Sequence, residues 1–230
     1  MGRIIKRYER DAKILKEEPD GVIMLCGTNV YLNESKVLYA QDDFDYEILK
    51  RDFEFKSGEW YVEDGWVVGK NSLSWPGMII SKENYYGDIM LDVTAKMVEP
   101  STHDINVMIH GDWDLEKDER GVGYVTGLEA FWHGNIGFEK SPEYKLVVAT
   151  GMLDFDPTKE YHLQFGNIGG ILFTLVNGRL GLMVSDPDPI DIHKHGKIGF
   201  EAFASWWKFK SLKVLELKSE YVGEKYNQEF

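Results

Sequence analysis

The feature that most constrains the fold is a two-residue period of apolar and polar side chains, which starts near Val22 and recurs in short runs to about residue 217. In KIGFEAFAS, residues 197–205, alternate positions are apolar, and Glu201 and Phe203 fall between them. Successive strand side chains point to opposite faces, so this period predicts strands with one buried face. Gly, Asn, Asp and Pro separate the runs, and DG at 64–65 and NG at 177–178 predict hairpin turns.

Many short strands with almost no helical pattern between them predict an all-β fold, an antiparallel two-sheet sandwich of jelly-roll type. No interval is long or biased enough for a linker, so we expect a single domain over residues 1–230. Residues 1–34 form an N-terminal extension that we expect to pack on it. Within the extension, apolar residues recur at helical spacing from Ile4 to Leu15 and predict a short helix that ends at EEPDG.

The charge and cysteine content exclude several classes of function. The formal net charge is -13, and an acidic surface repels both nucleic acid and anionic membranes. The single cysteine, Cys26, excludes an internal disulfide and a cysteine-based zinc cluster. The N-terminus lacks the apolar stretch of a secretory signal, and no apolar run approaches the length of a membrane span. We therefore expect a soluble cytoplasmic protein that binds neither nucleic acid nor membrane.

Three of the expected strands carry chemically useful side chains opposite an apolar face. These strands lie at 105–110, 124–133 and 197–205, and we expect them to contribute to one face. Their polar faces carry Asn106 and His110, then Glu129, Phe131 and His133, then Glu201 and Phe203. Sugars need this mixture, because carboxylates, imidazoles and amides bind hydroxyl groups while aromatic rings stack on the apolar face of a sugar ring. The pattern predicts a carbohydrate-binding groove.

Each of these features also has a simpler interpretation. The outer faces of sandwiches are normally polar, so any one of these side chains could simply be solvated. The run GDWDLEKDER, residues 111–120, is either a solvated charge run or a groove rim that carries Trp113. HKH at 193–195 is a weak metal signal, and SDPDP at 185–189 is a turn or a calcium site. We therefore expect no certain cofactor and leave open a structural calcium or other divalent metal.

Several catalytic signatures are missing from the sequence. It contains no G-x-S-x-G nucleophile elbow, no P-loop and no dinucleotide-binding fingerprint. The Glu-x-Asp-x-x-Glu strand of laminarinase-type glucanases is also missing, because the nearest run, GDIMLDVTA, lacks the second glutamate. A simple retaining glucanase is therefore not expected.

The order of several motifs resembles a known family. EWYVEDGWVVGK, MIISKENYYGDIMLDVTAKM, INVMIHG, GLEAF, YHLQFGNIGGILFTLVNGRL and HGKIGFEAFASWWKFKSLKVLEL follow one another over residues 35–217. In this order they resemble the concanavalin A-like jelly-roll domains of 3-keto-disaccharide hydrolase type, and equally their small intracellular relatives from bacterial pectin-utilisation clusters. The resemblance implies a jelly-roll fold and activity on a carbohydrate.

The family's motifs fall on particular residues of this chain. Its Gly-x-Glu strand falls on Gly127 and Glu129, and the end of another family strand falls near Asn106 to His110, with His110 where an arginine is common. In the closing strand, two residues differ from the family, which has glutamine at Glu201 and histidine at Phe203. Lys210 also stands where an arginine is usual. These departures leave the sheet pattern intact but weaken the case for a shared reaction.

These observations predict a cytoplasmic glycoside hydrolase-like enzyme that acts on an oligosaccharide or a modified sugar. Glu129 is the predicted general acid or base, and His110 and His133 assist it as a proton shuttle or as ligands of an optional metal. The predicted substrate-binding residues are Asn106 and Glu201, for hydroxyl groups, and Trp113, Phe131, Trp132 and Phe203, for stacking. Period-two counting places Trp132 inward unless a bulge turns it.

Two other functions remain open at this point. The same fold can carry a non-catalytic, lectin-like carbohydrate-binding protein, because a fold does not determine a function. A weaker alternative is an assembly protein whose tryptophans build a homo-oligomer interface. A convergent acid and base within hydrogen-bond reach in the groove would favour the enzyme over the binding protein.

Overall fold

The structure is a computed structural model that describes residues 21–130, 135–151 and 153–223. Within the described ranges, contacts define two compact units, one of residues 37–216 and one of residues 21–36 with 217–223. The larger unit contains the sandwich and the candidate site. No helix in the described ranges is long and apolar enough to cross a membrane.

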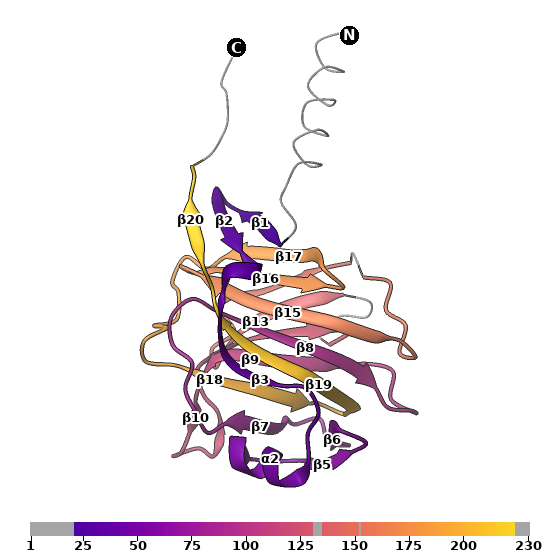
Figure 1. Cartoon of the computed structure of the whole chain (residues 1–230). Coiled ribbons are helices and arrows are strands. Elements are labelled where there is room, and N and C mark those ends of the chain that lie inside the picture. The colour runs from indigo at the N-terminus through magenta and orange to yellow at the C-terminus, as the bar shows by residue number, and fades with distance from the viewer. Residues whose placement is uncertain (1–20, 131–134, 152, 224–230) are drawn as a thin grey trace. The chain divides into compact units, whose positions relative to one another are not determined.

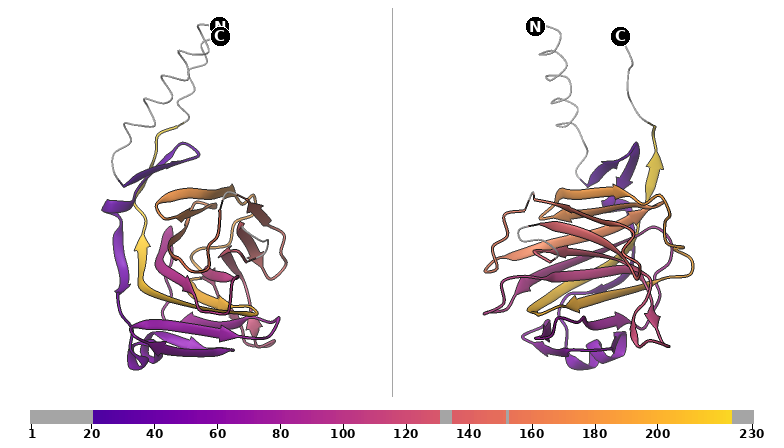
Figure 2. Two further views of the ribbon diagram at one scale, coloured as in Figure 1. Left: turned by 90° about the vertical axis from the view of Figure 1, so that its right-hand side faces the viewer. Right: turned by 180° about the vertical axis from the view of Figure 1, so that it is seen from behind.

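The larger unit is built from two antiparallel sheets (Figures 1 and 2). This arrangement confirms the predicted sandwich. The seven-stranded sheet has the order β14 (Val147–Thr150), β13 (Ile136–Ser141), β12 (Gly123–Leu128), β9 (Ile105–Gly111), β18 (Lys197–Ala202), β7 (Gly77–Ser81), β4 (Phe53–Phe55). The eight-stranded sheet has the order β17 (Arg179–Ser185), β16 (Ile171–Val176), β15 (Glu160–Ile168), β8 (Ile89–Met97), β19 (Ser205–Glu216), β6 (Trp66–Asn71), β5 (Glu59–Glu63), and β3 (Lys36–Gln41) also pairs with β19.

The core lies between the two sheets, where the apolar faces predicted by the alternation meet. Phe200 of β18 stacks on Phe209 of β19 with ring centroids 3.8 Å apart. Trp207 is fully buried beside them, and its indole N–H donates to the backbone oxygen of Glu201 at 2.9 Å. The neighbouring Trp206 is only partly buried. The adjacent tryptophans therefore face opposite sides of β19, as strand geometry requires.

Two predicted hairpin turns are present. Asp64 and Gly65 connect β5 to β6 with φ of 50° and 80°, and Asn177 and Gly178 connect β16 to β17 with φ of 52° and 75°. Positive φ at both central residues defines the turn type that matches the twist of a two-stranded hairpin. Asn, Asp and Gly tolerate this conformation best, which is why the dipeptides were informative.

One helix was missed by the sequence analysis. Helix α2 spans Tyr46–Asp52, and the Asp45 side chain caps it by accepting a hydrogen bond from the N–H of Ile48 at 2.7 Å. Leu49 is buried and anchors the helix to the core. Seven residues form barely two turns, which is too short for a helical period to stand out from the surrounding strands.

The smaller unit contains a three-stranded sheet of order β1 (Val22–Leu25), β2 (Thr28–Tyr31), β20 (Ser219–Tyr221), with a 3₁₀ turn, η1, at Leu32–Glu34. The strand expected in GVIMLCG corresponds to β1. The helix expected between Ile4 and Leu15 lies outside the described residues. The single-domain boundary and the packing of residues 1–34 on the sandwich stay predictions.

Candidate functional site

The candidate site lies on the outer face of the seven-stranded sheet, where the three strands singled out in the sequence are neighbours. Asn106 of β9 is paired with Gly127 of β12 on one side and with Glu201 of β18 on the other. Directly paired residues share a face, so the amide and the carboxylate lie side by side. Glu139 of β13 is paired with Val125, two residues from Gly127, and therefore belongs to the same face.

Gly127 keeps the floor of this face open. A Cβ atom at this position would lie 2.2 Å from Asn106 Oδ1 and 2.4 Å from the Cβ of Ala130. Such distances are far inside van der Waals contact, so any larger residue would displace the Asn106 amide. A glycine within a strand commonly marks a place where another group approaches the backbone closely.

A hairpin outside the sheet supplies the positive charge of the site. Strands β10 (Trp113–Asp114) and β11 (Glu119–Arg120) pair with each other, and the carboxylate of Asp112 accepts a hydrogen bond from the N–H of Val122 at 2.6 Å. Trp113 packs against a cluster of Met78, Ile80, Met108 and Val125 on the outer face of the sheet. Trp113 thereby holds the hairpin over the sheet, while residues 115–118 at its turn are exposed to solvent, so GDWDLEKDER combines a rim with a solvated turn.

Arg120 joins two carboxylates from different strands. One terminal nitrogen donates to Glu201 Oε2 at 2.6 Å, and the other contacts Glu139 Oε1 and donates to the hydroxyl of Tyr144 at 3.2 Å. All three charged side chains are buried. Burial works to lower the pKa of Arg120, but the charges of Glu201 and Glu139 outweigh it and raise that pKa. Burial raises the pKa of each glutamate, and the guanidinium opposes this.

Asp104 lies immediately before β9 and is the third buried acid of the site, after Glu139 and Glu201. Its two oxygens accept hydrogen bonds from the Asn106 amide and from the backbone N–H of Phe203, each at 3.0 Å. Burial, followed by the charge of Glu201, raises the pKa of Asp104 to about 8 despite these two donors. Asp104 is therefore mostly protonated at neutral pH, beside a glutamate whose ionised form Arg120 favours.

The Asn106 amide nitrogen links Asp104 to Glu201, and the amide oxygen has no partner among the described residues. Its nitrogen donates to Asp104 at 3.0 Å and lies 3.5 Å from Glu201 Oε1. Asn106 is 1% exposed, and among the described residues its Oδ1 has no hydrogen-bond partner. A buried acceptor without a partner is costly, so a donor from a bound molecule or from water would stabilise this site.

These groups lie at the base of a cavity of about 560 Å³ with aromatic side chains around it. Trp75 and Tyr144 are each 53% exposed, and Phe203 is 37% exposed. Exposed rings beside buried polar groups match the make-up of small-molecule sites. The outer-face cavity, as we call it, is lined by Ser74, Trp75, Pro76, Asp104, Asn106, Trp113, Glu119, Arg120, Ala130, Glu139, Pro142, Tyr144, Glu201 and Phe203.

The structure brings four of the predicted site residues together, since Asn106, Trp113, Glu201 and Phe203 all line the cavity. Glu129 lies just beyond β12 with φ of 52°, and its backbone N–H donates to the carbonyl of Asn135. It is not among the residues that line the cavity. Phe131, Trp132 and His133 lie outside the described residues, so their predicted roles stay predictions.

His110 lies elsewhere, in contrast to the expectation that it shares a pocket with Asn106. The pairing of β9 with β18 shifts register between Lys197 and Gly199, and His110 has φ of 49°. Such a bulge breaks the period-two rule and turns the imidazole to a different side. The ring is fully buried, 6.4 Å from the ring of Tyr124, and burial lowers its pKa to about 4.

Sequence reasoning missed five residues of the cavity that carry chemistry or contact surface: Trp75, Asp104, Arg120, Glu139 and Tyr144. Glu139 had a usable signal, because IGFEK alternates like its neighbouring strands. Arg120 had none, because it stands within a run of charges that reads as solvated. Within the described ranges, no group of three or more His, Cys, Asp or Glu side chains is arranged to hold a metal ion.

The comparisons with known proteins identify solved structures with a similar fold. No family profile and no curated protein matches the sequence. The solved structures that are similar include the carbohydrate-binding module CBM66 from Bacillus subtilis, at 15% identity and a TM-score of 0.57 over 71% of this chain and 95% of that one. A Bacillus subtilis protein of unknown function with a galectin-like fold shares 12% identity at a TM-score of 0.59, over 79% and 96% of the two chains.

A third similar structure comes from work on prominent human gut bacteria that express endo-acting O-glycanases to initiate mucin breakdown. It shares 13% identity at a TM-score of 0.58, over 80% of this chain and all of the other. At such low identity these likenesses establish the galectin-like sandwich and nothing about the ligand. They agree with the jelly-roll fold that the motif order implied.

Proposed function

We propose that the outer-face cavity binds a carbohydrate. The observation that carries this proposal is the pairing of a buried hydrogen-bonding network, formed by Asn106, Arg120 and Glu201, with exposed rings at the same cavity. Hydroxyl groups would bond to the network, and the apolar face of a sugar ring would stack on an aromatic side chain. The volume of about 560 Å³ suits one or two sugar rings by the usual size of ligand pockets.

Two further points support a sugar over other small molecules. Two proteins that share this fold are connected with carbohydrates: CBM66 is a carbohydrate-binding module, and the other structure comes from work on O-glycanases. The motif order that resembles the 3-keto-disaccharide hydrolase-type domains agrees with this, although kinship with that particular family stays a prediction. The cytoplasmic location, the homo-oligomer and a structural divalent metal also stay predictions.

The test is a glycan array followed by calorimetry of the best ligand on wild type, Trp75→Ala and Phe203→Ala. Removal of an aromatic ring that stacks on the sugar should weaken binding by roughly 10-fold, the effect of losing a well-packed aromatic contact. Tyr86→Ala is the matched control, because Tyr86 is another exposed aromatic residue outside the cavity. Sugar binding that survives both cavity substitutions would contradict the proposal.

A second candidate function, hydrolysis of a glycosidic bond, is favoured by Asp104. A carboxyl group whose pKa is raised to about 8 can donate a proton at neutral pH. Burial raises the pKa of Glu201 beside it as well, and the ion pair with Arg120 opposes that rise. A buried carboxyl group beside a second carboxyl group that is paired with a cation is an arrangement that can supply a general acid and a basic partner. The catalytic roles predicted for Glu129, His110 and His133 remain alternatives to this assignment.

Asp104→Asn and Glu129→Gln separate these assignments. If Asp104 is the general acid, its amide variant should lower the release of reducing ends by roughly 10²–10⁴-fold while sugar affinity changes little. Glu129→Gln should then leave turnover close to that of wild type. The reverse result would favour Glu129, and a sugar that binds without any cleavage would leave the binding function alone.

A further inference from the structure

The cavity has far more acidic than basic groups. Among its described lining residues, Glu119, Glu139 and Glu201 carry carboxylates, Asp104 is a further acid, and Arg120 is the single cation. The chain as a whole has a formal net charge of -13. A negative cavity on a negative protein repels anions and attracts cations, and low-dielectric walls strengthen the effect.

Both terminal nitrogens of Arg120, the one cation among the described lining residues, already bond a buried glutamate. One terminal nitrogen of Arg120 bonds Glu201 and the other bonds Glu139 and Tyr144. A carboxylate on a sugar that took the two-bond contact with both terminal nitrogens of Arg120 would have to displace one of these buried glutamates. The displaced glutamate would then be a buried charge without its partner, which is strongly unfavourable.

Neighbouring lysines are also engaged with other groups. Lys56 Nζ lies 2.7 Å from Glu54 Oε2 and over the ring of Trp113, 5.3 Å from the ring centroid. Lys117 Nζ lies 3.3 Å from Asp114 and 3.7 Å from Glu119. Neither lysine lines the cavity, so an acidic sugar would meet carboxylates before it met a free ammonium group.

The groups left for a ligand are mostly acceptors. Asn106 Oδ1 is buried and has no partner among the described residues, and within the same residues Glu201 Oε1 receives a 3.5 Å contact from the Asn106 amide. A hydroxyl group can donate to such atoms, and an ammonium group donates three hydrogen bonds and carries the complementary charge. A hydrogen bond between charged partners is roughly twice as strong as a neutral one.

We infer that the outer-face cavity selects sugars without an acidic group and binds a free amino sugar more tightly than its N-acetylated or hydroxyl counterpart. The inference rests on the proposed carbohydrate function and specifies the class of ligand. It excludes uronic and sialic acids as preferred ligands of this cavity.

The experiment compares matched sugars that differ in one substituent. Calorimetry would use oligosaccharides in the gluco and galacto series, each as the amine, the N-acetyl form, the neutral sugar and the uronic acid. We expect the amine to bind at least about 10-fold more tightly than the uronic acid, with the neutral sugars between them. The advantage of the amine should shrink as salt screens the charges.

The outcomes distinguish two kinds of failure. A uronic acid that binds as tightly as the amine would overturn the inference and leave carbohydrate binding intact. If no member of either series and no glycan on an array binds, the proposed function fails and this inference with it. An amine advantage that does not depend on salt would contradict the electrostatic cause and overturn the inference as stated.

A pair of variants on the hairpin sharpens the test. Glu119 lines the cavity and is only partly buried, so Glu119→Gln removes a negative charge without breaking the Arg120 network. We expect the ratio of amine to neutral-sugar affinity to fall by about two- to five-fold, the effect of one solvent-exposed charge pair. Glu116→Gln, on the same hairpin but outside the cavity lining, is the matched control and should keep the wild-type ratio.

Discussion

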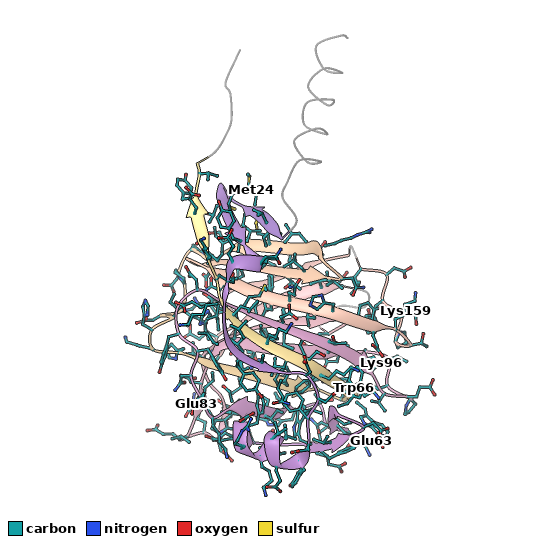
Figure 3. All side chains as sticks on the ribbon, in the orientation of Figure 1. Met24, Glu63, Trp66, Glu83, Lys96 and Lys159 are labelled. Carbon is teal, nitrogen blue, oxygen red and sulfur yellow. The ribbon has the colours of Figure 1, made fainter. Side chains whose placement is uncertain are left out.

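The outer faces of the two sheets differ in what they do with polar side chains. On the eight-stranded sheet, polar residues alternate with buried ones along β8, and Lys96 of β8 and Trp66 of β6 lie on this face (Figure 3). On the seven-stranded sheet, every residue of β9 and β12 is buried. The first face is the ordinary solvated side of a sandwich. The second face buries an amide and acidic side chains under a hairpin. Their burial costs free energy, and the stability of the fold does not require it.

The difference shows where to look for function in such a fold. Asp92 on the eight-stranded sheet accepts hydrogen bonds from His162 and Gln164, each at 2.8 Å, and the His162 side chain of this cross-strand group is 45% exposed. Glu201 on the other sheet has a comparable bond to Arg120, but in a buried setting. Buried charges are retained against a desolvation cost, and perturbed acids gather at functional sites. Burial, more than polarity, distinguishes the two faces.

The largest expected difference between the two faces follows from removing one cation on each. Arg120→Leu leaves Glu139 and Glu201 buried without their partner, and should lower the free energy of unfolding by about 3–5 kcal/mol. Lys210→Leu on the eight-stranded sheet loses a contact with the ring of Trp66 and should cost less than about 1 kcal/mol. Urea unfolding of both variants measures this, and equal losses would remove the distinction between the faces.

A smaller effect concerns how the stability contributed by His110 changes as the pH falls. Burial lowers the pKa of His110 to about 4, against about 6.5 in the unfolded chain, so the folded state resists protonation. Its contribution to stability is therefore complete above pH 6.5 and is lost as the pH falls toward 4. Between pH 7 and pH 5 the loss should be about 2 kcal/mol. Wild type compared with His110→Phe isolates it, and parallel pH profiles for the two would contradict the burial.

The smallest effect has the opposite sign and comes from His162 on the eight-stranded sheet. Its hydrogen bond to Asp92 raises its pKa, so its contribution is present below the unfolded pKa and lost as the pH rises through the folded one. The side chain is 45% exposed, so solvent screening keeps the effect below about 1 kcal/mol. Relative to His162→Gln, wild type should gain stability from pH 7 to pH 5. A loss would contradict the pairing.

Much of the fold could be predicted because the rules that set it are local. Alternation identified the strands, and the dipeptides at 64–65 and 177–178 identified two turns. The same parity argument placed Asn106, Glu201 and Phe203 at one site, because register aligns residues that share a face. The interpretation of Trp113 as a rim residue came from its position directly after β9.

The rest of the site depends on structural features that no local sequence pattern predicts. A register shift redirects His110, and parity cannot foresee a bulge. Arg120 reaches Glu201 across 81 positions of sequence, and the charge run around it gives no hint of burial. Asp104 precedes its strand with φ of 79°, outside any alternating pattern. Burial by residues that are distant in the sequence sets the pKa of each acid, and no single stretch of sequence predicts it.

The hairpin of β10 and β11 has a consequence for how this protein can change over generations. The sandwich and the carboxylates of Glu139 and Glu201 belong to the sheet, whereas Trp113, Glu119 and Arg120 belong to a short excursion between β9 and β12. Under the proposed function, substitutions in that excursion that keep Arg120 would alter recognition while the strands keep their pairing. Lineages that share this scaffold can therefore diverge in ligand preference through a dozen residues, and sequence similarity across the whole chain is a poor guide to which ligand each one binds.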